Sequence, residues 1–539
     1  MSNRMRASAW CLAVVFSGLM HGHAHALMAE NLMMGNPKAL ALGNAVTADP
    51  PGIDAIHFNP AGLSRLDGRQ LEVKAVGAYV EIGFETRSTP AYEAYLDQIG
   101  INFDDPYRNA SASADSIALM LPGIGVAEMP TGTVAGAVLG GVSFQPYKSR
   151  LTFANAIYAP LVGGYSYDDD SVGKFAAREV GISRITYLSP SVAYKLSDTL
   201  SVGASVGFSY VGFGMDLDAR VSHFLYGYAS AISGVAGDLC DLNFGGASVD
   251  YCALQINPFE GVVDVEIEAE TFFSPSFNLG VLWDATPWLA FGLTYRKGAS
   301  DRLEGEVSLT YADSLQAIYG SLCGSGGAFP SICSQLLGLP NGISTDKRDV
   351  ALNLEWPDYW ALGTSIKVTP RWKVNFDVKY LEASSWDEFI IEFEEPIPVL
   401  ELVKYITPNV NEDRVVVPRG YEDVWSWSVG TEYQLSERLA VRFGYEPRES
   451  AIPDDKLDHI VPIGDSKLYS AGLSYQFSRQ TVIDFGMGYL VSKQEIPAGS
   501  SSNLNASTGN TYVYSPFGGL DVETRLEAYL VELGIRSTF

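Results

Sequence analysis

The sequence predicts an all-β protein, a transmembrane antiparallel β-barrel of about 14 strands. Many segments alternate apolar and polar residues with a period of two, and a short polar turn recurs between them. After residue 26 no stretch of twenty apolar residues occurs, so no transmembrane helix is expected. A membrane-embedded chain without such helices must form a closed barrel, because only helices and closed barrels satisfy every backbone group in lipid.

Residues 529–539 are expected to form the last strand, between lipid and an aqueous lumen. A Phe at the end of such a strand is typical of the signal by which bacterial outer-membrane barrels are recognised, so the barrel assembly machinery is an expected partner. The alternative is the last strand of a soluble β-sandwich. One face carries Tyr529, Val531, Leu533 and Ile535, and the other carries Glu532, Gly534 and Arg536.

The N-terminus predicts export from the cytoplasm. Arg4 and Arg6 precede an apolar run at residues 7–20, and Ala24-His25-Ala26 supplies the small residues that a signal peptidase requires. Residues 1–26 are therefore expected to be a cleaved signal peptide. Together with the strand pattern, it predicts a multi-pass protein of the bacterial outer membrane.

Six short turns predict the strand count. They join twelve strands, and a strand at about 69–86 and the last strand bring the total to 14. Short turns of outer-membrane barrels face the periplasm, and long loops face outward. Charges stay on one face of each strand, because a charge facing mid-membrane lipid costs roughly 2–4 kcal/mol. The turns are 129–132, 195–200, 283–288, 367–372, 434–439 and 476–481.

The chain is acidic, with 63 Asp and Glu, 36 Lys and Arg and a formal net charge of −27. This balance argues against nucleic acid or an anionic membrane surface as a partner. Two interpretations of acidic runs such as 168–170 stay open. In the first, the acidic runs are solvated loops; in the second, they bind divalent ions that bridge to lipopolysaccharide. In either case lipopolysaccharide and outer-membrane lipids are expected to surround the protein.

Residues 27–67 do not alternate and contain a short motif, Phe58-Asn59-Pro60-Ala61-Gly62. Pro60 fixes its own φ and pushes Asn59 toward extended geometry. The Asn59 side chain can bond nearby backbone groups, and Gly62 admits conformations that other residues avoid. Taken alone, the motif also fits an ordinary turn that leads into the first strand.

With this motif and the Ala-rich stretch 42–49 before it, the chain resembles the FadL/TodX family of outer-membrane transporters. The resemblance implies that residues 27–67 are a plug, or hatch, inside a barrel of residues 68–539. It also implies a monomer without a cofactor, which takes up long-chain fatty acids or similar hydrophobic molecules passively. Cargo would be captured by apolar extracellular loops and released laterally at a kink in the third strand after the hatch moves. Pro50-Pro51 follows Asp49, and the resemblance does not fix the exact spacing of residues within the plug around it.

Apolar residues at the mature N-terminus and in two loops are the candidates for ligand binding. Flexible side chains at the N-terminus adapt to varied ligands, and one loop group has helical spacing. The alternatives are that the N-terminal residues pack inside the barrel as a signal-peptide flank, and that the loops pack on each other. The candidates are Leu27, Met28, Leu32 and Met33, then Leu315, Ile318, Tyr319 and Leu322, and then Phe224 and Tyr226.

The third strand is expected at about 133–147, where Gly140, Gly141 and Pro146 are candidates for a lateral opening. Glycine pairs weaken a strand, and proline removes a ladder donor. The alternative is that the glycines simply make room for the plug.

Four cysteines remain after residue 26 and allow three disulfide pairings. Cys240–Cys252 and Cys323–Cys333 are favoured, because each pair falls within one predicted extracellular loop of an oxidising compartment. A zinc site would use tighter spacing, so no metal is expected.

Enzyme motifs are lacking: outside the signal peptide the histidines are His57, His223 and His459, and no nucleophile elbow or metalloprotease helix occurs. The protein is therefore not expected to be an enzyme. Besides the fatty-acid importer, three hypotheses stay open: an importer of aromatic or alkane hydrocarbons, an exporter of fatty-acid derivatives, and a surface adhesin.

Overall fold

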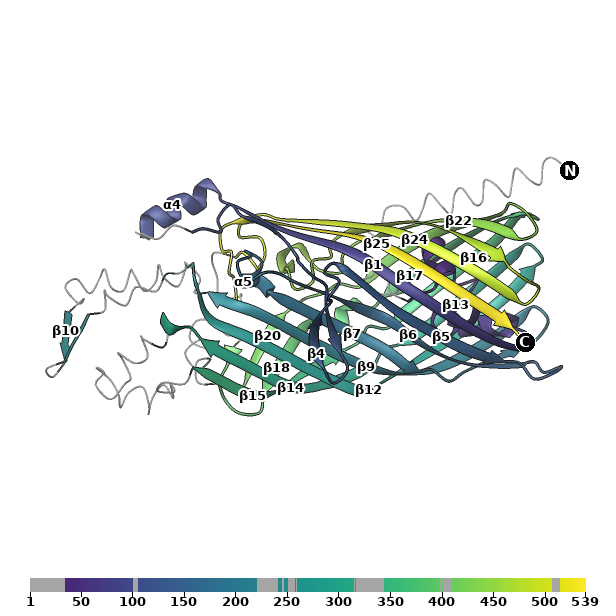
Figure 1. Ribbon diagram of the computed structural model, residues 1–539, viewed down its shortest axis with the longest axis horizontal. Coiled ribbons are helices and arrows are strands. Elements are labelled where there is room, and N and C mark those ends of the chain that lie inside the picture. Colours follow the sequence, from purple (N-terminus) through teal and green to yellow (C-terminus); the bar gives the residue numbers. More distant parts are fainter. Residues whose placement is uncertain are drawn as a thin grey trace.

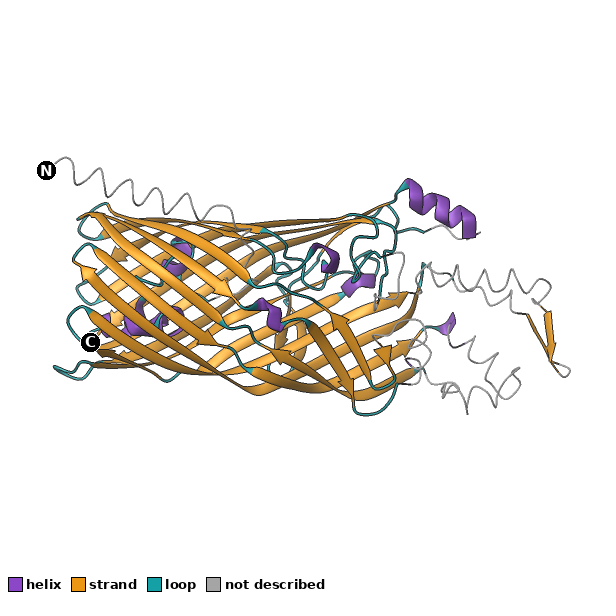
Figure 2. Cartoon of the chain, turned by 180° about the vertical axis from the view of Figure 1, so that it is seen from behind, coloured by secondary structure: helices purple, strands orange, loops and turns teal. Residues whose placement is uncertain are grey.

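The computed structural model is a long, closed β-barrel with short helices inside one half (Figures 1 and 2). The predicted signal peptide and residues 27–33 lie outside the described part of the chain. The structure describes residues 34–99, 105–220, 241–244, 247–250, 257, 259–314, 316, 344–397, 400, 410–506 and 514–539.

Fourteen antiparallel strands form the wall, as predicted. The barrel closes where β1 pairs with β25, from Gln70–Thr538 to Arg87–Asp521. Several wall strands are interrupted and therefore carry two labels. In wall order the strands are β1 (Arg69–Arg87), β5 (Val134–Phe144), β6 (Leu151–Ser166), β7 (Glu179–Leu188) with β8 (Ser191–Lys195), β9 (Leu200–Arg220), β12 (Gly261–Thr286), β13 (Leu289–Lys297) with β14 (Ser300–Tyr311), β15 (Thr345–Glu355) with β16 (Tyr359–Thr369), β17 (Trp372–Leu381) with β18 (Glu388–Phe393), β20 (Arg414–Pro418) with β21 (Val424–Gln434), β22 (Leu439–Arg448), β23 (Ser466–Gln476), β24 (Thr481–Ile496) and β25 (Asp521–Thr538).

Smaller elements lie between the wall strands or at the barrel's ends. We call the end with the short connections the turn end and the opposite end the loop end. The helix α4 projects from the loop end in Figure 1. The smaller elements are α4 (Pro90–Ile99), β2 (Ser111–Ser113), β3 (Ala118–Leu121), β4 (Gly125–Glu128), α5 (Lys174–Ala177), β10 (Asp241–Phe244), β11 (Ala247–Asp250), η3 (Ala383–Ser385), β19 (Val410–Asn411) and η4 (Asp454–Lys456).

Five of the six predicted turns connect wall strands at the turn end, but the prediction for 129–132 was wrong. These residues do form a turn, with the Gly132 amide donating to the Met129 carbonyl at 2.9 Å. It leads from β4 into β5, however, and the sixth turn-end connection is 145–150, between β5 and β6. Pro and Gly predict that the chain turns but not which strands the turn joins. The predicted number of turn-end connections was therefore right, and the position of one of them was wrong.

The predicted faces of the last strand are confirmed. Ile535 and Val531 are exposed on the outer surface, whereas Glu532 is buried toward the lumen. Within the described residues, no helix combines the length and apolar character needed to cross a membrane.

The β3–β4 hairpin lies against the outer face of the wall, in front of β7 and β9 (Figure 1). Glycines on β9 allow this approach: a Cβ on Gly214 would lie 2.1 Å from a Val126 methyl group, and one on Gly212 would lie 2.5 Å from Met120. The Val126 amide donates to the Glu268 carboxylate of β12 at 2.7 Å. The hairpin is thus fastened to the outside of the barrel.

Residues 34–66, which we call the luminal segment, lie inside the turn-end half of the barrel (Figure 2). Asn36 caps the first helix by accepting from the Ala39 amide at 3.0 Å, and Pro37 follows at the first helical position. The segment's elements are α2 (Pro37–Ala41), η1 (Gly52–Asp54), α3 (Ala55–Phe58) and η2 (Pro60–Arg65).

Candidate functional site

Asn59 of the predicted motif joins the luminal segment to the wall. Its side-chain amide donates to the carbonyls of Thr47 (2.8 Å) and Val281 (3.0 Å), and its side-chain oxygen accepts from the Ala61 amide (3.1 Å). Thr47 lies within the luminal segment, whereas Val281 lies on β12. Asn59 is fully buried; its bonds to Thr47 and Ala61 are buried, and its bond to Val281 is partly buried. The motif is therefore a structural anchor as well as a helix cap.

Wall glycines leave room for the motif. A Cβ on Gly280 of β12 would lie 2.1 Å from the Asn59 side-chain oxygen, and one on Gly203 of β9 would lie 2.3 Å from the Pro60 carbonyl carbon. A Cβ on Gly62 would lie 2.6 Å from Pro50. Pro50 thus packs directly on the motif's glycine.

Buried ion pairs fasten the luminal segment elsewhere. The Lys74 ammonium of β1 lies 2.5 Å from the Asp54 carboxylate, and both side chains are 1% exposed. Asp49 contacts Lys38 (2.9 Å) and Lys373 of β17 (2.6 Å). Burial lowers the pKa of Lys38 to about 8, against the opposing effect of Asp49.

His57 and several luminal cations are already engaged. Burial and the neighbouring Arg296 guanidinium, 2.8 Å from the His57 Nε2, hold the pKa of His57 well below its usual range. Lys379 forms an ion pair with Glu446, and Arg442 contacts Glu432 and Asp484, each at 2.7 Å. Lys379 and Arg442 thus pair with carboxylates of the wall strands.

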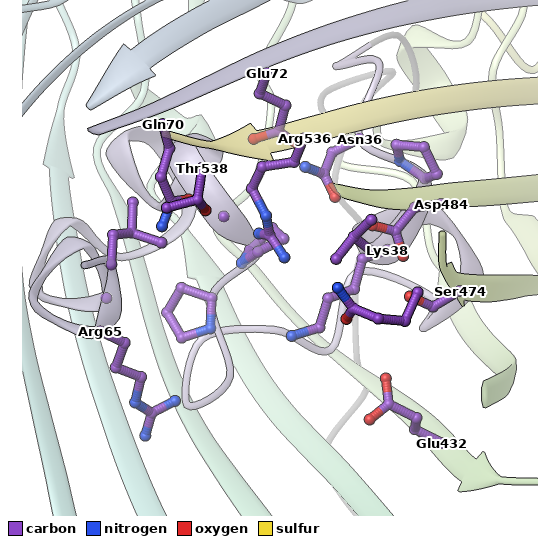
Figure 3. A pocket seen from close by; sticks show the side chains of 18 of the residues that line it. Asn36, Lys38, Arg65, Gln70, Glu72, Glu432, Ser474, Asp484, Arg536 and Thr538 are labelled. Atoms are coloured by element: carbon purple, nitrogen blue, oxygen red, sulfur yellow. The ribbon is translucent and has the colours of Figure 1, made fainter. Parts of the chain in front are cut away.

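A polar pocket of about 390 Å³ lies between the luminal segment and the wall at the turn end (Figure 3). Arg536 and Glu72 from the wall and Lys38 and Arg65 from the luminal segment surround it. Its charged lining suits water and ions and does not suit an apolar molecule.

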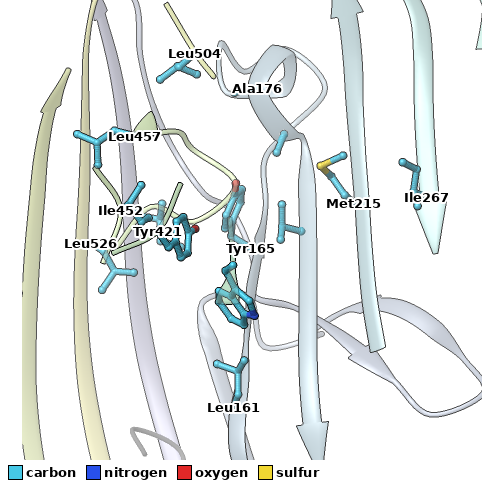
Figure 4. Packing of buried hydrophobic residues seen from close by; sticks show 14 of the residues in the cluster. Leu161, Tyr165, Ala176, Met215, Ile267, Tyr421, Ile452, Leu457, Leu504 and Leu526 are labelled. Carbon is cyan, nitrogen blue, oxygen red and sulfur yellow. The ribbon is translucent and has the colours of Figure 1, made fainter. Parts of the chain in front are cut away.

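An apolar cavity of about 330 Å³ lies in the loop-end half of the lumen. Luminal side chains of β9, β12, β14, β18 and β20 form its wall. Loops 449–465 and 497–520 close it with Asp458, His459, Asn503 and Leu504. Figure 4 shows hydrophobic packing in this half of the lumen, with Met215 and Ile267 on one side of Tyr165 and Tyr421 and Ile452 on the other. On β9 the cavity begins ten residues beyond Ser205, which bonds the luminal segment, so roughly 30 Å of strand separates the two.

The wall has a gap in pairing between β5 and β6. Within the described stretch 134–166, these strands pair only from Gly140–Ile157 to Phe144–Phe153. Beyond it, β6 has an extra residue relative to β7 between Tyr158 and Leu161, where Pro160 removes a ladder donor. At the loop end, Ser116 bridges to Ser166 and closes the gap. We call this opening in the ladder the β5–β6 window.

The strand numbering predicted for this region was wrong. Residues 134–144 form the second wall strand, and β6 is the third, because 129–132 is not a turn-end connection. Gly140 holds the last β5–β6 pair at the window's edge. Gly141 faces Ile53 of the luminal segment, with 2.8 Å from its Cβ position to an Ile53 methyl group. Pro146 lies in the turn 145–150. The irregularity expected in the third strand occurs at 158–161, a position that the glycine pair did not indicate.

All ten sequence-predicted ligand residues lie outside the described residues, as do the four cysteines. The structure instead brings together residues that sequence reasoning missed, including Met215, Ile391 and His459. Strand alternation indicates that Met215 and Ile391 face the lumen, but it does not indicate which luminal side chains line a cavity. In the described part of the chain, no group of three or more His, Cys, Asp and Glu side chains is arranged to hold a metal ion.

Comparison with known proteins agrees with this architecture. A family model described as "Outer membrane protein transport protein (OMPP1/FadL/TodX)" matches residues 17–539. The chain belongs to this family. Its members are outer-membrane transport proteins, which supports an outer-membrane location for this one.

Individual members of the FadL/TodX family are distant in sequence. A long-chain fatty acid transport protein of Escherichia coli O6:H1 is 24% identical over 214 residues, 40% of this chain and 41% of that protein. The chain thus matches less than half the length of that relative.

Solved structures of the FadL/TodX family share the fold. A Pseudomonas aeruginosa FadL homologue, 16% identical, has a TM-score of 0.64 and covers 96% of this chain and 100% of its own. The Ralstonia pickettii toluene transporter TbuX, also 16% identical, has a TM-score of 0.56 and covers 94% of this chain and 99% of its own. At these identities the likeness shows the fold alone.

Proposed function

We propose that this protein carries long-chain fatty acids or similar hydrophobic molecules passively across the outer surface of a bacterial outer membrane. The observation that carries the proposal is the apolar luminal cavity, which offers an acyl chain an environment that polar lipopolysaccharide does not. Each methylene transferred from water to such a site contributes about 0.8 kcal/mol, which is ample for capture.

Release through the β5–β6 window into the membrane is the exit that the geometry supports. The window's outer rim is apolar, with Val138 74% exposed and Ile157 also exposed. Tyr165 of β6 connects the cavity to this wall, since its hydroxyl donates to the His459 carbonyl at 2.5 Å. The turn-end pocket, by contrast, is lined with charges. An apolar cargo that reaches the lumen therefore meets less resistance at the window.

The luminal segment would act as the hatch. Gly35, near its described beginning, contacts Leu139 beside the window: its Cβ position lies 3.1 Å from a Leu139 methyl group. Met34 is buried in the same apolar cluster as Tyr158 of β6. Movement at this end of the segment would change the window's inner rim without breaking the Asn59 anchor.

Uptake of labelled oleate and labelled toluene, in cells lacking their own transporter, tests the proposal. Oleate uptake that depends on the protein supports the fatty-acid function, whereas toluene uptake alone shifts it to aromatic hydrocarbons. If neither enters although folded protein is present in the outer membrane, import of these classes is refuted. Deleting residues 34–38 in the same assay separates a transporter, which loses uptake selectively, from an adhesin, which is indifferent.

A further inference from the structure

One end of the apolar cavity is polar but has no free charge. Its charged lining residue is Asp458, whose carboxylate pairs with Arg419 and also accepts from the Val461 amide at 3.1 Å. Arg419 donates its second amino group to the Tyr421 hydroxyl at 2.8 Å. The described lining includes neither lysine nor arginine. The pair is therefore neutral as a unit and leaves no cation for a ligand.

Three other groups at this end keep unused hydrogen-bonding capacity. His459 is 0% exposed, and both of its ring nitrogens are without a partner among the described residues. The ring lies among Phe84, Tyr165 and Tyr167, with centroid distances of 4.5 to 5.4 Å. Burial lowers the pKa of His459 to about 3, so the ring is neutral, with one donor and one acceptor.

Asn503 adds an acceptor and Tyr514 adds a donor. The Asn503 amide donates to the carbonyls of Pro418 (2.9 Å) and Lys456 (3.3 Å), which fixes its orientation and leaves its oxygen buried without a partner among the described residues. The Tyr514 hydroxyl accepts from the Arg220 amide at 3.0 Å, and no described residue accepts its own proton. The Arg220 guanidinium is occupied by the Pro516 carbonyl and by Asp105 at 3.7 Å.

The composition of two long loop-end connections does not favour an anion either. Residues 221–260 and 312–344 contain no Lys or Arg in their sequence, and the chain's net charge is −27. A carboxylate would have to lose its hydration and approach Asp458 without a compensating cation, which is costly in an apolar site. A cargo with no polar atom would leave the buried His459 ring and the Asn503 oxygen without the hydrogen bonds that a headgroup supplies, which also loses affinity.

We infer that the cavity selects hydrophobic molecules with an uncharged hydrogen-bonding headgroup, such as long-chain alcohols or protonated fatty acids, whose headgroup lies at His459, Asn503 and Tyr514. The inference rests on the proposed function and narrows its substrate class. A fatty acid then enters this site as the neutral acid, and its carboxylate is excluded. Selection acts on the headgroup's charge, while the apolar wall accepts any chain that fits.

Photo-crosslinking with matched probes tests the inference. Hexadecanol, hexadecanoic acid, hexadecanesulfonate and hexadecane, each with a mid-chain diazirine, are added to the purified protein, and labelled cavity peptides are identified by mass spectrometry. Between about pH 9 and pH 7, labelling by the alcohol should stay constant and labelling by the acid should rise as it becomes protonated. The sulfonate should not label the cavity, and hexadecane should label it more weakly than the alcohol.

Two variants make the test specific. His459→Phe keeps the ring's shape and should reduce alcohol labelling about tenfold while leaving hexadecane labelling unchanged, because only the headgroup bond is lost. Ile391→Lys places a cation on the cavity wall and should confer labelling by the sulfonate.

Strong sulfonate labelling of the unmodified protein, or acid labelling that grows as the pH rises, would overturn the inference. Equal labelling by hexadecane and hexadecanol would overturn it as well. These outcomes leave the proposed uptake function standing, because that function is judged by oleate and toluene entry into cells. If neither oleate nor toluene enters cells while the alcohol still labels the cavity, the transport function is refuted and the headgroup site stands.

Discussion

The side-chain amide of Asn59 donates to the backbone carbonyl of Val281 at 3.0 Å, joining the luminal segment to a wall strand 222 residues away in sequence. A side-chain-to-backbone bond of this kind does not depend on which residue occupies the wall position. It holds the segment as long as β12 keeps its register.

Asn59→Ala should loosen the luminal segment while the barrel stays folded. It removes two buried hydrogen bonds and one partly buried one, which at about 1 kcal/mol each amounts to roughly 3 kcal/mol. We expect faster hydrogen exchange in residues 45–62 and faster entry of small sugars into proteoliposomes. Asn257→Ala, whose amide bonds Glu260 near the loop end, is the control and should change neither. An unchanged exchange rate in Asn59→Ala would show that the anchor is dispensable.

Lys74→Met should be more damaging than the double change Lys74→Met with Asp54→Leu. The single change leaves the Asp54 carboxylate buried and uncompensated, at a cost of about 3–5 kcal/mol, whereas replacing both charges removes that penalty. Conductance in planar bilayers should therefore show frequent channel openings for the single variant and few for the double variant. Equal opening frequencies would contradict a buried ion pair at this position.

Gly280→Ala should displace the motif, because a Cβ there would lie 2.1 Å from the Asn59 side-chain oxygen. Gly163→Ala on β6 is the matched control, since no atom lies within 4 Å of its Cβ position. Both variants should keep the heat-dependent gel migration of a folded barrel. Only Gly280→Ala should show increased sugar entry, and a similar increase in both would mean that strand glycines matter for another reason.

Deleting Ala159 should narrow the β5–β6 window and reduce uptake several-fold. The deletion removes the extra residue of β6 between Tyr158 and Leu161 and keeps both side chains on the luminal face. Deleting Phe273 removes the corresponding extra residue of β12, between Thr271 and Ser274, away from the window. Cellular uptake of the best cargo measures both. If the two deletions reduce uptake equally, the window is not the exit.

Packing of loop 449–465 should weaken as the pH falls from 7 to 5. The pKa of His459 is about 3 when buried and about 6.5 when the loop opens. Below pH 6.5 the open loop therefore binds a proton that the packed loop cannot, and packing loses about 1.4 kcal/mol per pH unit. Hydrogen exchange of residues 456–463, corrected for intrinsic rates, should accelerate accordingly. His459→Phe should abolish this acceleration, and its persistence would assign the effect to other groups.

The barrel and its membrane-facing surface were readable from the sequence, as the last strand shows. Val531 and Ile535 alternate with Glu532 and Gly534, and this period of two predicts which side chains meet lipid, because a strand has only two faces. The turns could be counted for a similar local reason. The turn at 129–132 was assigned to the wrong end of the barrel, because local sequence predicts that the chain reverses but not which strand the following segment pairs with.

For the candidate site, the motif at Asn59 could be predicted only in part from the sequence. Its residues predicted a tight cap, and the structure adds the bond to Val281, which no spacing in the sequence indicates. The cavity was harder to predict from the sequence. Its residues Met215, Ile391 and His459 come from three separate regions whose sequences resemble ordinary strands and loops.

The sequence by itself determined the strand alternation, the number of strands and the position of the motif, because each depends on neighbouring residues along one chain segment. Only the tertiary structure decided where the wall is unpaired and which groups share the cavity. The β5–β6 window depends on pairing between strands, and the neutral polar end of the cavity depends on which charges find partners after the barrel closes. Both are properties of contacts made across the lumen and between strands.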